Sequence, residues 1–138
     1  MINIRGVYNF EDEESDVVEI FTTGTYAQEG DAFLITYQES EATGFEGSTT
    51  TLRVEREDRV TLSRSGPAEA QLIVQNGVRH QCYYDVGYGD MMIGVSGQSI
   101  RSNLGESGGD LEFRYALDVN ALLASENEMF ISVKESPQ

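Results

Sequence analysis

Short runs in which apolar and polar residues alternate follow one another along the chain, separated by residues typical of turns. The runs are rich in Val, Ile, Thr, Phe and Tyr, which are enriched in strands. They recur roughly every 8–12 residues, the spacing expected of an all-β sandwich or barrel. The pattern predicts strands over residues 1–10, 17–28 with a kink at Gly24, 32–40, 48–56, 59–64, 69–75, 78–86, 90–103, 110–117 and 129–134.

Turn chemistry supports this division of the chain. Asn76-Gly77 is the strongest hairpin signal, because both residues tolerate the positive φ that a tight hairpin turn requires. The alternation breaks once, near the C-terminus. There Asp118 is a suitable N-cap, and the pattern predicts one or two helical turns between about 118 and 126.

So many consecutive antiparallel strands are expected to close on themselves, because a flat sheet would expose its edges. The connections are of hairpin length, which favours an up-and-down order over a Greek key. The sequence therefore predicts an all-β fold, an antiparallel up-and-down barrel of eight or more strands. On the inward faces of these strands we expect to find Leu62, Val74, Ile93, Phe113 and Ile131 buried.

Length and composition fit one domain over residues 1–138. No stretch approaches the roughly 20 apolar residues of a membrane-spanning helix, and the N-terminus does not resemble a signal peptide. The single cysteine, Cys82, excludes an internal disulfide and points to a cytoplasmic protein. The net charge of −15 argues against binding to nucleic acid or to anionic membranes, since both need basic surfaces.

Four segments together resemble a known family. They are Tyr37-Gln38-Glu39-Ser40, the run 60–66 (VTLSRSG), the run 83–89 (YYDVGYG) and the run 113–117 (FRYAL). In order and spacing they are similar to the YwiB-like proteins, small bacterial β-barrel proteins without an established function. The resemblance spans nearly the whole chain and implies a calycin-like (lipocalin-like) barrel. It implies no activity.

The sequence contains no clear catalytic site and no clear metal site. His80 and Cys82 lie two residues apart on one face of a strand, the arrangement of a possible nucleophile and base. No third, orienting residue is identifiable, and a free cysteine is more often a buried core residue. One His and one Cys do not make a zinc site. No glycine-rich phosphate loop is present, so the sequence indicates no enzyme, no metal and no cofactor.

One constellation of aromatic and charged residues remains. Tyr37 and Glu39 continue the inward face of their strand, and Arg64 and Tyr115 do so in theirs. Tyr84 follows His80 and Cys82 on a further strand. The candidate ligand-binding residues are therefore Tyr37, Glu39, Arg64, Tyr84 and Tyr115, which would supply polar groups at one end of an apolar barrel. In the opposing interpretation, Arg64 pairs with Glu39 and the tyrosines belong to the core.

Two functions from different classes follow. The first is a barrel that binds a small apolar molecule or an amphipathic anion, with Arg64 as the positive group. The alternative is a non-enzymatic structural or protein-interaction module with a barrel filled by side chains. A cavity above about 300 Å³ would favour the ligand, and a filled interior would favour the partner protein. The partner, whether small molecule or protein, and the oligomeric state are not specified by the sequence.

Overall fold

The structure of the protein, a computed structural model, describes residues 2–10, 16–39, 46–55, 58–66, 69–85, 90–119 and 122–134. Within these ranges the chain forms strands and connecting turns, and no helix occurs. The strands are β1 (Ile2–Phe10), β2 (Asp16–Thr22), β3 (Gly24–Glu29), β4 (Ala32–Gln38), β5 (Thr49–Glu55), β6 (Arg59–Ser65), β7 (Ala70–Gln75), β8 (Arg79–Asp85), β9 (Asp90–Ser102), β10 (Gly108–Val119) and β11 (Leu122–Lys134).

All these strands belong to one antiparallel sheet, in the order β2-β1-β11-β10-β9-β8-β7-β6-β5-β4-β3. From β3 to β11 each strand pairs with the next one along the chain, which confirms the up-and-down order. The first strand β1 then pairs with the last strand β11, so the first and last described strands lie side by side inside the sheet. The all-β antiparallel class is as the sequence predicts.

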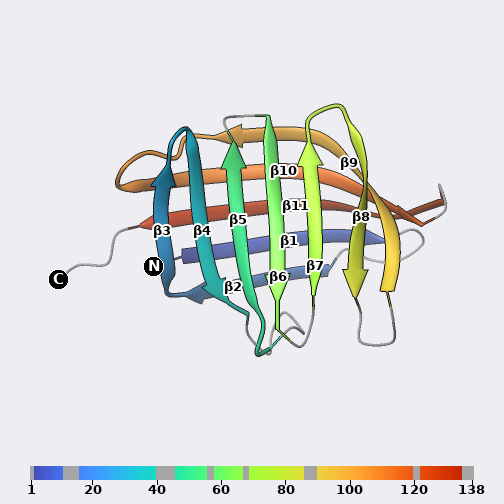
Figure 1. Ribbon diagram of the computed structural model, residues 1–138, viewed down its shortest axis with the longest axis horizontal. Coiled ribbons are helices and arrows are strands. Elements are labelled where there is room, and N and C mark those ends of the chain that lie inside the picture. The colour runs from blue at the N-terminus through green and yellow to red at the C-terminus, as the bar shows by residue number, and fades with distance from the viewer. Residues whose placement is uncertain are drawn as a thin grey trace.

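The sheet folds over into two layers whose strands cross (Figure 1). Strands β3 to β8 form one layer, and β10, β11, β1 and β2 form the other. The long strand β9 pairs with β8 on one side and with β10 on the other, and so joins the layers. At the other side β2 and β3 are the edges of the sheet, and no ladder joins them in the described part of the chain. The expected barrel is therefore rolled but not closed by strand pairing.

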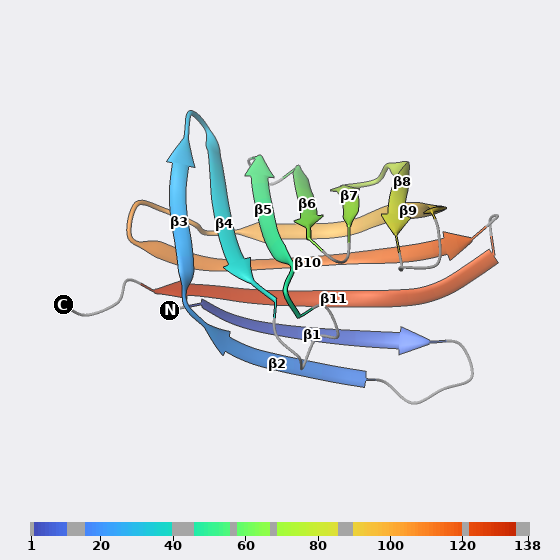
Figure 2. The ribbon, with the colours of Figure 1, turned by 60° about the horizontal axis from the view of Figure 1, so that its bottom comes forward.

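The chain leaves one layer and enters the other between β2 and β3 (Figure 2), and Gly24 is the first residue of β3. A Cβ atom at this position would lie 2.1 Å from the backbone oxygen of Thr36. The predicted kink is thus a complete change of layer, and the single strand expected over 17–28 is two strands. The Asn76-Gly77 turn is also present: Gly77 has a φ of 76°, and the Val78 N–H donates to the Gln75 carbonyl at 3.1 Å.

The helical segment predicted for 118–126 is wrong. Strand β10 continues to Val119, and β11 begins at Leu122 rather than near Met129. Their ladder pairs Val119 with Leu122 and Leu117 with Ser125, with one irregularity after Leu117. The reason is that two long neighbouring strands satisfy the backbone groups of this stretch, which outweighs its local helix propensity.

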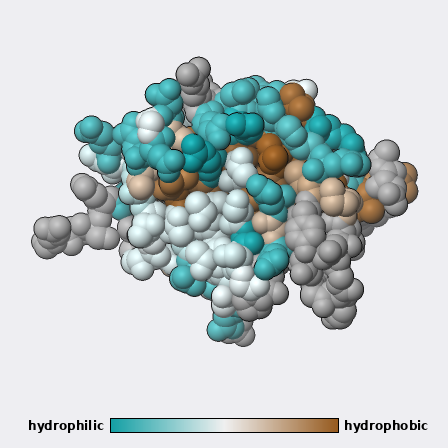
Figure 3. Space-filling view, in the orientation of Figure 1, coloured by the Kyte–Doolittle hydropathy of each residue, from teal (hydrophilic) through white to brown (hydrophobic). Residues whose placement is uncertain are grey.

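The core lies between the two layers. The five residues predicted to be buried are all buried, with Phe113 1% exposed and Val74 and Ile131 2% exposed. On the outside, the visible face of the β3–β8 layer is nearly neutral in hydropathy over the middle of its strands, and hydrophilic side chains gather at its upper end (Figure 3). No helix in the described residues is long and apolar enough to cross a membrane.

Candidate functional site

A cavity of about 510 Å³ lies between the two layers. Residues from β1, β2, β10 and β11 form one wall, and residues from β4, β6 and β7 form the other. These strands bring apolar side chains inward because alternate residues of a strand point to the same face. The apolar part of the lining includes Ile4, Val18, Ile20, Leu72, Leu117 and Met129. The interior between the layers is therefore not completely filled.

A buried ion pair lines the cavity where β4 and β6 end. The Glu39 side chain is 2% exposed and the Arg64 side chain 9% exposed, and Arg64 Nη2 lies 3.7 Å from Glu39 Oε1. Thr50, on the strand between them, donates to the same carboxylate oxygen at 2.7 Å. Arg64 Nε donates to Thr50 Oγ1 at 3.4 Å. The three side chains form one network in which the charges of Glu39 and Arg64 compensate each other.

Tyr37 joins this network from β4. It is 5% exposed, and it shares its inward face with Glu39. Burial and the negative charge of Glu39 raise the pKa of its hydroxyl far above the usual value. Tyr37 is therefore a neutral hydroxyl at every physiological pH.

The structure brings four of the five predicted site residues together. Tyr37, Glu39, Arg64 and Tyr115 all line the same cavity. The Glu39–Arg64 pair agrees with the interpretation in which these two charges compensate each other. The open space beside the pair agrees with the interpretation in which the barrel holds a ligand. Tyr84 pairs through its backbone with Ala70 and Met91, and its side chain lies outside the described residues.

Several lining residues were not foreseen. Ser125 and Asn127 on β11 are 4% and 2% exposed and line the cavity, and so does Tyr8 on β1. The signal for the first two was present, because Ser125 and Asn127 continue the face of Met129, Ile131 and Val133 backward by steps of two. Because a helix was predicted over 118–126, this alternation was not assigned to a strand.

His80 and Cys82 do not form a catalytic pair. Cys82 is 4% exposed, and its sulfur accepts a hydrogen bond from the Ile73 N–H at 3.3 Å. Burial raises the pKa of the thiol, which keeps it protonated and unreactive. The His80 ring is hydrogen-bonded through Nε2 to Gln75 Oε1 at 2.7 Å. Cys82 is thus a core residue.

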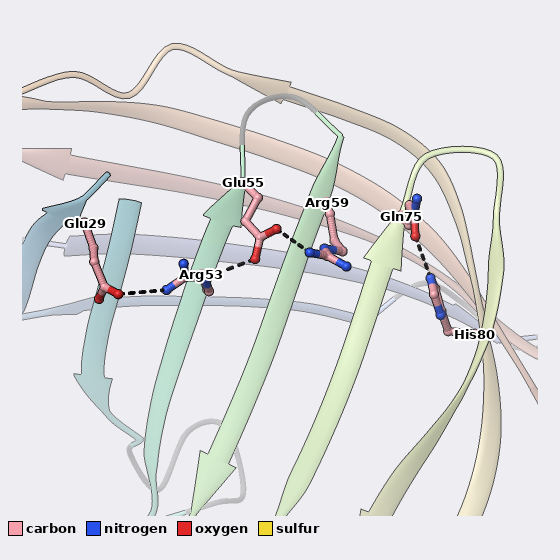
Figure 4. Close-up of polar contacts among 6 residues, drawn as sticks. All are labelled: Glu29, Arg53, Glu55, Arg59, Gln75 and His80. Carbon is pink, nitrogen blue, oxygen red and sulfur yellow. Dashed lines mark hydrogen bonds and ion pairs between the residues drawn. The ribbon is translucent and has the colours of Figure 1, made fainter. Parts of the chain in front are cut away.

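A second group of charges crosses the outer face of the β3–β8 layer (Figure 4). Arg53 Nε donates to Glu55 at 3.0 Å, Arg59 donates to the other oxygen of Glu55, and Arg53 Nη1 lies 3.8 Å from Glu29. The hydrogen bonds from the two arginines lower the pKa of Glu55. These side chains compensate each other at an exposed surface. Among the described residues, no group of three or more His, Cys, Asp or Glu is placed to hold a metal ion.

Comparisons with known proteins agree with this fold. The crystal structure of the ywiB protein from Bacillus subtilis superposes with a TM-score of 0.85 and 23% sequence identity, over 99% of this chain and 90% of that chain. A search of curated proteins finds no significant match. A family profile described as "Domain of unknown function (DUF1934)" matches residues 2–131. The chain therefore belongs to this YwiB-like family of proteins of unknown function.

Proposed function

We propose that the protein binds a small, predominantly apolar molecule in the cavity between its two layers, in the manner of a calycin-like barrel. The observation that carries the proposal is the cavity of about 510 Å³ with a mainly apolar lining. Small-molecule sites typically enclose about 300–1,000 Å³, with apolar walls and a few polar groups that orient the ligand. A module that acts only as a scaffold needs no such space.

The cavity lining contains a few polar groups, with Glu39 and Arg64 on one wall and Asn127 on the other. They lie among apolar neighbours, so an amphipathic molecule suits the cavity better than a pure hydrocarbon. The sequence suggests an anionic ligand because Arg64 would supply a positive group. Glu39, at 3.7 Å, neutralises that charge and weakens the reason for an anion. The lone, buried Cys82 supports a reducing, cytoplasmic location.

The experiment uses pyrene, a hydrocarbon whose fluorescence reports an apolar environment. Val18 is partly buried in the cavity wall on β2, whereas Phe21 on the same strand is 67% exposed. The purified protein is titrated with pyrene alongside Val18→Trp, which fills the cavity, and Phe21→Ser, which removes an exposed apolar group.

We expect saturable binding that Val18→Trp abolishes and Phe21→Ser leaves unchanged. Loss of binding in Phe21→Ser alone would place pyrene on the surface, and absence of saturable binding would contradict the proposed function. Native mass spectrometry of freshly purified protein provides a second measurement. It shows directly whether a small molecule is carried, or whether a protein partner is retained, as the alternative interaction module would require.

A further inference from the structure

Ser125 and Asn127 are neutral polar residues on an otherwise apolar inward face of β11. The next inward residues, Met129, Ile131 and Val133, all belong to the core. Asn127 Nδ2 donates to Ser125 Oγ at 3.1 Å. Both side chains line the cavity and both are more than nine-tenths buried. A polar pair in this position requires a physical reason, because burying it costs free energy.

The hydrogen bonds of Asn127 are incomplete within the protein. An asparagine side chain can donate two hydrogen bonds and accept two. In the described part of the chain, the bond to Ser125 is the one that this side chain makes. The Asn127 Oδ1 atom and the Ser125 hydroxyl hydrogen therefore keep unused hydrogen-bonding capacity at the cavity wall. Polar groups of buried residues are normally paired, and these two residues line the cavity, so a polar group inside the cavity is the natural partner.

Two tyrosines flank Asn127 across the sheet. Asn127 is in register with Tyr8 on β1 and with Tyr115 on β10, and all three line the cavity. The Tyr8 ring lies over Gly6, where a Cβ atom would meet its hydroxyl at 2.6 Å. The amide thus lies in a row of aromatic residues, and the apolar side chains of β2 complete the wall beyond Tyr8.

The charges of the cavity do not favour an ionic ligand. Within the described residues, the cavity wall carries the Glu39–Arg64 ion pair, in which the two opposite charges compensate each other. The whole protein carries −15. An anion would therefore lose its hydration without gaining a free countercharge, and would enter against the overall field.

We propose that the ligand carries an uncharged hydrogen-bonding group, such as a hydroxyl or an amide, that pairs with Asn127 and Ser125, while its apolar part lies against β1 and β2. This inference rests on the proposed function and specifies its ligand. It assigns the specificity of the site to the polar pair of β11 and not to Arg64.

The test displaces bound pyrene with two amphiphiles that have the same chain length, decan-1-ol and decanoate. The wild-type protein is compared with Asn127→Leu, Ser125→Ala and Arg64→Met. We expect decan-1-ol to bind the wild type more tightly than decanoate does. Asn127→Leu should weaken decan-1-ol binding by about tenfold, because the ligand hydroxyl loses its buried partner, and Ser125→Ala should weaken it in the same direction.

Pyrene affinity is the control in each variant. Because pyrene has no polar group, its binding should stay within about twofold in Asn127→Leu and Ser125→Ala, which also shows that both are folded. If pyrene fails to bind even the wild type, the proposed function itself fails. If pyrene binds but decan-1-ol affinity is unchanged in Asn127→Leu, water alone satisfies the amide and this inference is wrong. Tighter binding of decanoate, lost in Arg64→Met, would also overturn it in favour of an anion.

Discussion

The buried carboxylate of Glu39 is stabilised by polar groups from neighbouring strands. By its place in the alternation it belongs to the inward face of β4, after Ile35 and Tyr37. A lone carboxylate there would be costly, because burial takes the charge out of water. The structure compensates it with Arg64 from β6 and with a hydrogen bond from Thr50 on β5. Three consecutive strands of the sheet, β4, β5 and β6, therefore share one polar network.

This network predicts a specific result for Arg64. Arg64→Met leaves the buried Glu39 carboxylate without its countercharge, and we expect a loss of about 3–5 kcal/mol in the free energy of unfolding. The double variant Glu39→Gln/Arg64→Met should recover much of the loss, because it removes both charges. Urea unfolding of the single and double variants measures this coupling.

Arg53 supplies the control for that experiment. It also pairs with glutamates, but its side chain is 40% exposed. Arg53→Met should therefore cost less than about 1 kcal/mol. An equal loss in Arg53→Met and Arg64→Met, or a double variant less stable than Arg64→Met, would show that burial does not make the Glu39–Arg64 pair special.

At the scale of the elements, the connection between β2 and β3, called the joint below, determines how the sheet folds over. These strands follow each other directly in sequence, yet they lie at opposite ends of the sheet order. The joint lets the sheet fold over, so that β2 becomes a wall of the cavity opposite β4. The cavity therefore depends on a backbone approach that Gly24 permits.

Gly24→Ala tests this dependence. The added Cβ would lie 2.1 Å from the Thr36 backbone oxygen, and backbone cannot yield as a flexible side chain does. We expect a loss of roughly 1–3 kcal/mol in the free energy of unfolding, together with weaker pyrene binding. Gly105→Ala is the matched control, since its Cβ would meet no atom nearer than 4.0 Å. Equal stability of the two variants, measured by urea unfolding, would show that the joint tolerates a side chain.

For the whole molecule, the excess of acidic residues is the dominant property. The 24 acidic residues exceed the 9 basic ones by 15. The ion pairs of the outer face involve only a few of the acidic residues. Repulsion among the remaining charges opposes the compact state and extends over about 30 Å at 0.01 M salt. This repulsion acts at long range, unlike the contacts that hold individual strands.

Salt should therefore stabilise the protein. We expect the melting temperature to rise when NaCl is increased from about 0.01 M to about 0.5 M, because screening shortens the range of the repulsion. Arg101→Glu changes an exposed residue of β9 and takes the net charge from −15 to −17, so its melting temperature should rise more with salt. A melting temperature that falls with salt would show that specific ion pairs outweigh the net charge.

The sequence by itself determined most of the strands, their up-and-down order and the inward faces, because alternation and turn residues act locally. It placed Leu62 and Phe113 in the core, and it put Tyr37, Glu39, Arg64 and Tyr115 on inward faces, where they line one cavity. The tertiary structure alone decided the rest. Residues 118–126, locally suited to a helix, belong to β10 and β11 wherever they are described, because neighbouring strands pair with their backbone. The pairing of β1 with β11 and the folding at Gly24 created the cavity, and both depend on contacts between distant parts of the chain that no local pattern encodes.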